Sequence, residues 1–544
     1  MTVEGTYGWL VLLGGLLAGS AGLCIFNIGR SRLLYDLHKI PGPAGWPLLG
    51  NALDVIGSKI LHHHQLLTDW TQRYGQVFIW HLGLQPVLVI TDPDEVARLC
   101  NNSNKQANLP KWPKSYLITE ARAPHFSLFG TPNHEEWKSY RKTTNAAFSP
   151  ENMRKAYPKI YGAVLRGSHA LKQLCKQGPV DVSDLALRLT ADVIGSFGFE
   201  HDFGALRLET KSDGNLQLAP QPFLQDVKTW LEYIVLVFSS PWYKLLHAAF
   251  PWRAEAKRVR NGLLGVRQSE DELANLFRSR GVQPTSNSSL WACLGRLVNY
   301  KDGTPVNHDA LAINTRIFMV AGYETTAHLI TWALLELASD QALQDQVREE
   351  LRTAGLVPTP QQPQPRDLEW ADLTKLPVLE SVIKETLRLH ATAPLGTFRI
   401  TDQDMIVGGY RVPKNTPVQI APYPMHRSSA NFVRPLDFWP ERWAQQTPSF
   451  PTDPEYPDAT PAGNRHNISG SWNPFSLGPR NCIGQTLALA EARTALAVLV
   501  AAFQFDLAEG FRKDHYLQHE QVWRITLQPK DGLLLSVTPL VETP

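Results

Sequence analysis

Cysteine is scarce in this sequence, and the few cysteines form no pairing pattern. The 544 residues include five cysteines, an odd number, with no Cys-x-x-Cys pair among them. A disulfide framework or a cysteine zinc site needs grouped thiols, so both are disfavoured, and a reducing compartment fits better. Four of the five look like ordinary small apolar residues; only Cys482 has unusual neighbours.

An excess of charge of one sign is also lacking. The 53 basic and 51 acidic side chains nearly cancel, so nothing in the charge points to a nucleic-acid partner. The sequence has no internal repeat and no Gly-x-Gly-x-x-Gly unit of the kind that binds flavin or nicotinamide dinucleotides. Apolar residues make up 43%, which is the balance of a globular protein with a large core.

Charged residues are missing altogether from Gly5 to Gly29. Roughly 20 apolar residues span a bilayer, so this run is long enough. Glu4 precedes it and basic residues follow from Arg30, which places the bulk of the chain in the cytosol by the positive-inside rule. We predict a single uncleaved membrane anchor over residues 1–29; a signal peptide and burial within a soluble domain are the alternatives.

Proline interrupts the chain directly after this run. The three prolines between Pro41 and Pro47 cannot continue a helix, so residues 30–50 are predicted to be a basic, proline-rich hinge. Length alone would suggest two or three domains. The proline-rich stretches at 358–366 and 445–472 are too short to require a boundary, so residues 51–544 are predicted to form one domain.

Helical periodicity dominates the middle of the chain, over residues 135–350. Two β-rich runs within 76–93 predict a hairpin, short β-like pieces return near 405–420, and a last hairpin is predicted over 523–537. The predicted fold class is mainly α with small β-sheets (α+β).

The segment NPFSLGPRNCIGQ, residues 473–485, surrounds Cys482 with Gly478, Gly484 and Arg480. Glycines allow backbone amides to approach a sulfur or a flat macrocycle closely, and a nearby cation lowers a thiol's pKa. An arginine can pair with an anionic group. The pattern suits attachment of a planar, acidic, metal-bearing cofactor through one thiolate; a buried structural cysteine is the alternative.

This segment resembles the haem-binding signature of the cytochrome P450 family, Phe-x-x-Gly-x-Arg-x-Cys-x-Gly. Phe475, Gly478, Arg480, Cys482 and Gly484 occupy its five fixed positions. Other motifs of the family follow in the expected order, so the resemblance covers nearly the whole chain. It implies the cytochrome P450 fold, a single large haem domain behind the anchor, and haem b (iron protoporphyrin IX) with Cys482 as the axial thiolate.

The segment KETLRLH places Glu385 and Arg388 on one side of a helix, and FWPERW adds Arg442. An isolated pair would be a surface salt bridge. In the family the matching triad stabilises the core beside the cofactor, which implies a folding and haem-retention role for these three residues.

AGYETTAHL lies in a stretch, 311–337, that is apolar on almost every face, so a core helix is predicted there. A Glu-Thr-Thr cluster in such a helix needs partners, and threonine can bond to its own helix carbonyls. The resemblance implies that Gly322 lets the helix open beside the haem, that Thr325 bonds iron-bound oxygen, and that Glu324 delivers protons.

Trp137 and Arg141 stand one helical turn apart. Arginine suits bidentate carboxylate contacts and tryptophan offers an indole N–H. The pair resembles the family's haem-propionate clamp, with Arg399 a further candidate; an amphipathic helix and a solvated arginine are the alternatives.

Residues 229–252 are strongly apolar and aromatic. They are helix core in part, but Trp242, Tyr243 and Trp252 also suit a membrane interface. The family places the active-site entrance here, which implies a lipophilic substrate that enters from the bilayer.

The resemblance therefore implies a monooxygenase that uses O2 to hydroxylate or epoxidise a lipophilic substrate, with a long-chain fatty acid or an isoprenoid or sterol lipid favoured. Electrons would come from NADPH–cytochrome P450 reductase, with cytochrome b5 as a second donor. The implied location is the endoplasmic reticulum membrane, single-pass, with the catalytic domain facing the cytosol.

Two other functions stay open at this point. A haem-thiolate isomerase or dehydratase that acts on hydroperoxides would need neither O2 nor reductase, but such enzymes commonly lack the helix threonine or disturb the cysteine loop. A non-catalytic haem- or lipid-binding protein would not need the oxygen-handling motif.

Overall fold

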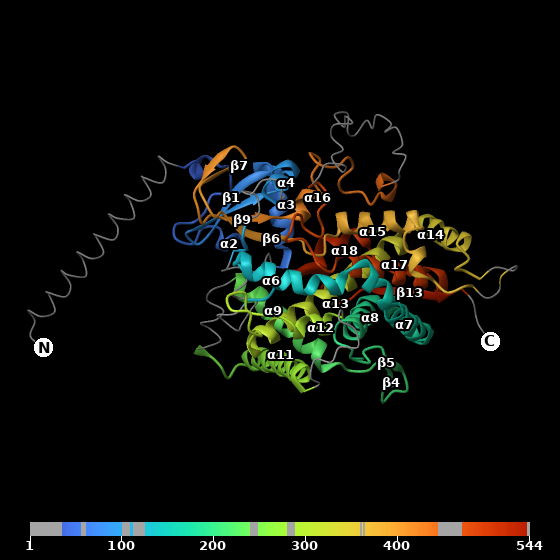
Figure 1. Cartoon of the computed structure of the whole chain (residues 1–544). Helices are drawn as coiled ribbons and strands as arrows, with labels where there is room; N and C mark the ends of the chain where they lie inside the picture. The colour runs from blue at the N-terminus through green and yellow to red at the C-terminus, as the bar shows by residue number, and fades with distance from the viewer. Residues whose placement is uncertain are drawn as a thin grey trace, which may run out of the picture.

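The computed structural model describes residues 35–55, 61–100, 109–112, 126–239, 249–279, 289–358, 362, 365–443 and 470–540. Helices form most of it, and the strands gather in small sheets at one end and at the edges (Figure 1). The predicted class, mainly α with small β-sheets, is confirmed.

The largest sheet has four strands in the order β1-β2-β9-β6. Its first two strands are β1 (Val77–Leu82) and β2 (Gln85–Ile90), which pair antiparallel as the predicted hairpin. Only two residues separate them, and Gly83 takes a positive φ of 62° there, which a side chain would oppose. β9 (Pro417–Ile420) and β6 (Thr397–Ile400) complete the sheet and bring a distant segment beside the N-terminal one.

The longest helix is α13 (His308–Ser339), which runs through the middle of the helical part (Figure 1). Most of its side chains are buried, as the all-round apolar sequence predicts. It packs against α8 (Val182–Gly198), α15 (Pro377–Leu389) and α17 (Gln485–Ala502). A core helix of this kind presents its few polar side chains to fixed neighbours.

The remaining helices of eight or more residues surround this core or flank the four-stranded sheet. They are α3 (His63–Tyr74), α4 (Pro93–Cys100), α6 (His134–Thr144), α7 (Pro150–Leu174), α9 (Pro222–Ser239), α11 (Ala254–Ser279) and α14 (Gln341–Thr353).

The C-terminal strands differ from the predicted hairpin over 523–537. β11 (Gln521–Arg524) and β12 (Thr526–Pro529) pair with each other around Ile525, whose φ is 74°. β13 (Leu534–Pro539) instead joins β10 (Phe503–Leu507) and β3 (Val180–Asp181) in a separate sheet. The sequence signals two strands and a turn, but it does not say which partners complete the sheets.

The predicted anchor, residues 1–29, lies outside the described residues. Of the predicted hinge, the part from Tyr35 on packs against the domain: Pro41 accepts a hydrogen bond from the Ile79 amide (2.9 Å), and Asp36 pairs with Arg411 (3.2 Å). The contacts of the domain therefore begin before the predicted border at residue 51.

Within the described residues, one helix is long and apolar enough to cross a bilayer, namely α17. It is a core helix, because it packs against α7, α13, α14 and α15. Its apolar composition is explained by this packing and says nothing about a membrane.

Candidate active site

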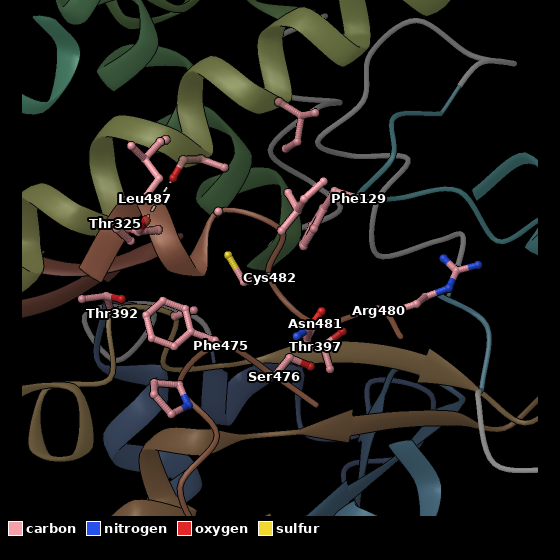
Figure 2. A pocket seen from close by; sticks show the side chains of 18 of the residues that line it. Phe129, Thr325, Thr392, Thr397, Phe475, Ser476, Arg480, Asn481, Cys482 and Leu487 are labelled. Atoms are coloured by element: carbon pink, nitrogen blue, oxygen red, sulfur yellow. Dashed lines mark hydrogen bonds between the residues drawn. The ribbon is translucent and has the colours of Figure 1, made fainter. Parts of the chain in front are cut away.

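A cavity of about 300 Å³ lies between α13, the cysteine loop that precedes α17, α6 and the strand β6. Its surface is mostly apolar. The apolar lining residues include Leu128, Phe148, Ile194, Ile317, Phe318, Leu329, Leu387, Ile420 and Leu487. Figure 2 shows the Cys482 sulfur projecting from its loop toward the centre of this cavity, with Arg480 placed toward one edge.

The cysteine loop is held in a tight shape by its own backbone. The Cys482 amide donates to the Phe475 carbonyl (2.8 Å), and Ser476 and Gly478 both have positive φ, 62° and 70°. A Cβ at position 478 would lie 1.7 Å from the Cys100 carbonyl oxygen. Only glycine can occupy this position, so Gly478 shapes the loop although it does not line the cavity.

The sulfur of Cys482 combines access to the cavity with burial inside the protein. Burial raises the pKa of the thiol, whereas the Gly484 and Gln485 amides and the charge of Arg141 oppose that shift. These amides stand at the start of α17, where N–H groups have no partner within the helix. They favour a thiolate at the point where a metal would replace the proton.

Three cations belong to the cavity wall: Lys111, Arg141 and Arg480. Arg141 donates both to the Asn481 carbonyl (2.8 Å) and to its side-chain oxygen (2.9 Å), which joins α6 to the cysteine loop. Arg480 donates to the Thr131 carbonyl (2.7 Å), and its Cζ lies 4.8 Å from the centre of the Trp137 ring.

Among the lining residues that the structure describes there is no aspartate or glutamate. Three cations gathered in one wall favour an anionic ligand. The predicted trio of Trp137, Arg141 and Arg480 is thus brought together at one cavity.

Arg399, the fourth predicted residue of this kind, does not line the cavity. Its side chain is 2% exposed and donates to the Leu109 carbonyl (3.1 Å), so it fastens β6 to the distant segment 109–112. Lys111, which the sequence reasoning missed, lies on the wall instead and donates to the Thr397 hydroxyl (2.6 Å). The only sequence signal for it was a lysine between apolar residues and prolines.

On the wall formed by α13, Thr325 donates to the carbonyl of Ala321 (3.0 Å), one turn earlier in the same helix. The expected opening of the helix at Gly322 is not seen in α13, which is helical without interruption from His308 to Ser339. Gly322 serves close packing instead: a Cβ there would lie 2.7 Å from the Ile194 side chain.

Glu324 does not line the cavity, although its neighbours Thr325 and Thr326 do. Its side chain is 4% exposed and lies on the side of α13 that meets β12. Burial raises the pKa of Glu324 to about 8, and the nearby Thr526 hydroxyl opposes part of that shift. At neutral pH this carboxyl therefore holds its proton.

The predicted triad forms as an ion network with no exposed atoms. Arg388 makes two bonds to the carboxylate of Glu385 (2.9 and 2.8 Å), and Arg442 makes a third (3.0 Å). The Trp439 amide and the Trp443 indole N–H complete the set of donors (2.8 and 2.9 Å). The arginines also donate to five backbone carbonyls of the 426–437 segment, so the network fixes the chain that leads to the cysteine loop.

This arrangement agrees with the comparison to known families. The model of the family Cytochrome P450 matches residues 40–535. The chain belongs to the cytochrome P450 family.

Relatives within the cytochrome P450 family align along nearly the whole chain. Cytokinin hydroxylase of Arabidopsis thaliana is 27% identical over 537 residues, which cover 94% of this chain and 93% of the relative. Averantin hydroxylase of Aspergillus parasiticus is 28% identical over 527 residues (94% of each chain). Cytochrome P450 3A5 of Homo sapiens is 26% identical over 556 residues (96% and 95%).

As a cytochrome P450, the protein is an oxidoreductase of the monooxygenase class, and its cofactor is haem with a cysteine thiolate as axial ligand. The cavity fits that group. One thiol points into the cavity, most of its wall is apolar, and the three cations on that wall suit the acidic edge of a porphyrin.

Proposed function

We propose that Cys482 is the axial thiolate, that Trp137, Arg141, Arg480 and Lys111 hold the acidic edge of the haem, and that the enzyme hydroxylates or epoxidises a lipophilic compound. The observation that carries the proposal is the position of the Cys482 sulfur in a cavity whose other wall carries Thr325. When bound, haem supplies the activation of O2 and the insertion of one oxygen atom into the substrate.

The chain's own residues supply position and protons. The amides of Gly484 and Gln485 favour the charged form of the sulfur, and the bonds between Arg141 and Asn481 keep the cysteine loop at a fixed distance from α6. Thr325 presents its hydroxyl to the cavity, and protonated Glu324 stands beside it in sequence as the proton source.

Electrons come, in this proposal, from NADPH–cytochrome P450 reductase, with cytochrome b5 as a second donor. The reason is that the sequence has no dinucleotide-binding unit of its own. The donor would dock on the basic face near Cys482.

The substrate class rests on the apolar wall of the cavity. A long-chain fatty acid or an isoprenoid or sterol lipid fits this surface, and the printed names of the relatives, a cytokinin hydroxylase and an averantin hydroxylase, show that the family's substrates differ widely. Of the predicted entrance, residues 229–252, the part 240–248 lies outside the described residues, Trp242 and Tyr243 included. Trp252 is 65% exposed, as an interfacial side chain would be.

The proposed location is the endoplasmic reticulum membrane, which the chain would cross once, with its catalytic domain in the cytosol. The uncharged run from Gly5 to Gly29 and the basic residues after it support this orientation.

The test is the absorption spectrum of the full chain, reduced and bound to carbon monoxide. A strongly red-shifted Soret band is expected, Cys482→Ala should abolish it, and Cys100→Ala should keep it, because Cys100 packs outside the cavity. A band at the position of histidine-ligated haem, or a red-shifted band that survives Cys482→Ala, would contradict the assignment. Lipophilic compounds that shift this spectrum can then be tested for turnover with reductase and NADPH.

A further inference from the structure

One face of α13 carries buried polar side chains at intervals of one helical turn: Glu324, His328 and Trp332, exposed by 4%, 1% and 0%. Residues four apart lie above one another on a helix. Glu324 approaches Thr526 and the Trp332 indole donates to the Leu527 carbonyl (2.9 Å), so both turns meet consecutive residues of β12. His328 lies on the same face of the helix, one turn from each of them.

Neither ring nitrogen of His328 has a hydrogen-bond partner among the described residues. Burial lowers the pKa of His328 to about 3, so the ring is neutral and has one N–H donor and one acceptor nitrogen. A buried polar atom without a partner costs about 1–3 kcal/mol. Such groups in folded proteins are usually bonded to an internal water.

The polar atoms at this crossing favour a water rather than a direct contact. The Thr526 hydroxyl lies near enough to the Glu324 carboxyl to lower its pKa, but no hydrogen bond of normal length and angle joins this hydroxyl to a group among the described residues. No ion pair joins Glu324 to a basic side chain within the part of the chain that the structure describes. An internal water needs two to four polar partners, and Glu324, His328 and Thr526 provide them.

The crossing lies next to the wall of the active-site cavity. The Leu527 amide donates to the carbonyl of Thr392 (3.0 Å), and the Thr392 side chain lines the cavity (Figure 2). Glu324 itself faces away from the cavity, so its proton has to be held in place on the β12 side before Glu324 can pass it toward Thr325.

We propose that His328 and Thr526 bind an internal water that hydrogen-bonds to the carboxyl group of Glu324, and that His328 thereby acts as a positioning residue for the proton supply of the enzyme. This inference rests on the proposed function of the cavity, and it adds a residue to that function. His328 accepts from or donates to the water through its neutral ring and does not itself change protonation.

The test isolates the C=O stretch of protonated Glu324 as the infrared difference between the full-length haem protein and its Glu324→Gln variant, recorded in H2O and D2O. In a His328→Leu background the same difference should move to higher frequency, because the carboxyl loses its water. His328→Gln, which keeps a donor and an acceptor, should restore the original frequency.

Trp332→Phe is the matched control. It removes a hydrogen bond between α13 and β12 one turn from His328 and two turns from Glu324, so the Glu324 stretch should not move. An unchanged frequency in His328→Leu would overturn the proposal, and so would the lack of a D2O-sensitive band, since Glu324 would then be ionised. A failure of Cys482 as the axial ligand would appear separately, in the carbon monoxide spectrum, and would leave the infrared result readable.

Discussion

Two buried polar regions flank the cavity, one around Glu385 and one around Glu324. They differ in whether the carboxyl group has charged partners. On the side of the cysteine loop, the carboxylate of Glu385 meets two guanidinium groups and two N–H donors, all within 3.0 Å. On the other side, within the described residues, Glu324 has no ionic partner and neither ring nitrogen of His328 has a hydrogen-bond partner.

The two environments have opposite effects on their carboxyl groups. Arg388 and Arg442 outweigh the effect of burial and hold the pKa of Glu385 below its ordinary value, whereas burial alone raises the pKa of Glu324 to about 8. A fully paired charge fixes the chain around it. A neutral acid that keeps its proton near physiological pH can give that proton away, so we assign stability to the first region and, within the proposed function, proton supply to the second.

The largest change in stability is expected when the carboxylate of the first region is removed. Glu385→Gln should destabilise the enzyme by about 3–5 kcal/mol, because two buried arginines lose their counter-charge. The measurement is the denaturant midpoint of the haem protein. Glu380→Gln is the control: this residue of α15 forms partly exposed ion pairs with Lys384 and Arg493, so its loss should cost less than about 1 kcal/mol.

A smaller loss is expected when one donor of the network is removed. Trp443→Phe deletes the indole N–H that donates to Glu385 (2.9 Å) and keeps the aromatic ring. Hydrogen bonds to charged groups contribute about 1.5–3 kcal/mol, and the denaturant midpoint should fall accordingly. An effect as large as that of Glu385→Gln would mean that packing of the indole, rather than the charge, is what the network needs.

The second region should make the stability of the protein depend on pH. Because the pKa of Glu324 is about 8 in the folded state and 4.5 ordinarily, the unfolded chain is ionised between these values while the folded one keeps its proton. Stability therefore falls as pH rises from 4.5 to 8, by at most about 1.4 kcal/mol per pH unit from this group, and changes no further outside that window.

Glu324→Gln removes this dependence. The stability of the variant relative to that of the unmodified enzyme should therefore increase as pH rises through the window. Unfolding measured over a series of pH values checks this. Glu385→Gln gives the opposite trend, since the pKa of Glu385 is lowered and its stabilisation is lost only as pH falls below 4.5. A constant difference between Glu324→Gln and the unmodified enzyme would mean that Glu324 is not buried as a neutral acid.

The smallest effect on stability is expected for Thr325→Ala. The hydroxyl bonds only to a carbonyl of its own helix, among the contacts described, and its loss should cost about 1 kcal/mol or less. The same change should lower the amount of product per NADPH oxidised and raise peroxide release, while the carbon monoxide spectrum stays intact. Unchanged coupling would remove Thr325 from the proton path.

Local sequence patterns predicted much of this molecule. The hairpin of β1 and β2, the core helix α13 and the close approach of a backbone amide to the Cys482 sulfur each depend on neighbouring residues: β-rich runs around a turn, an apolar surface all round, and glycine beside the thiol. The spacing of Glu385 and Arg388 on one helix also gave half of the ion network.

Predictions that depend on distant segments were less complete. Arg399 carries the right charge but bonds to Leu109, while Lys111 occupies the cavity wall. Gly322 was expected to open its helix, but what requires glycine there is the side chain of Ile194 on another helix, which leaves no room for a Cβ. The strand β13 has a clear β pattern, yet it pairs with β10 and β3 rather than with its neighbour β12.

The sequence by itself determined the family, the cysteine that faces the cavity and the helix that carries Glu324 and Thr325, because each is recorded in residues close together along the chain. Only the tertiary structure decided which buried carboxyl forms ion pairs and which one stays neutral. Whether a buried carboxyl is ionised depends on what packs against it, and for Glu324 that is β12, which follows it by about two hundred residues.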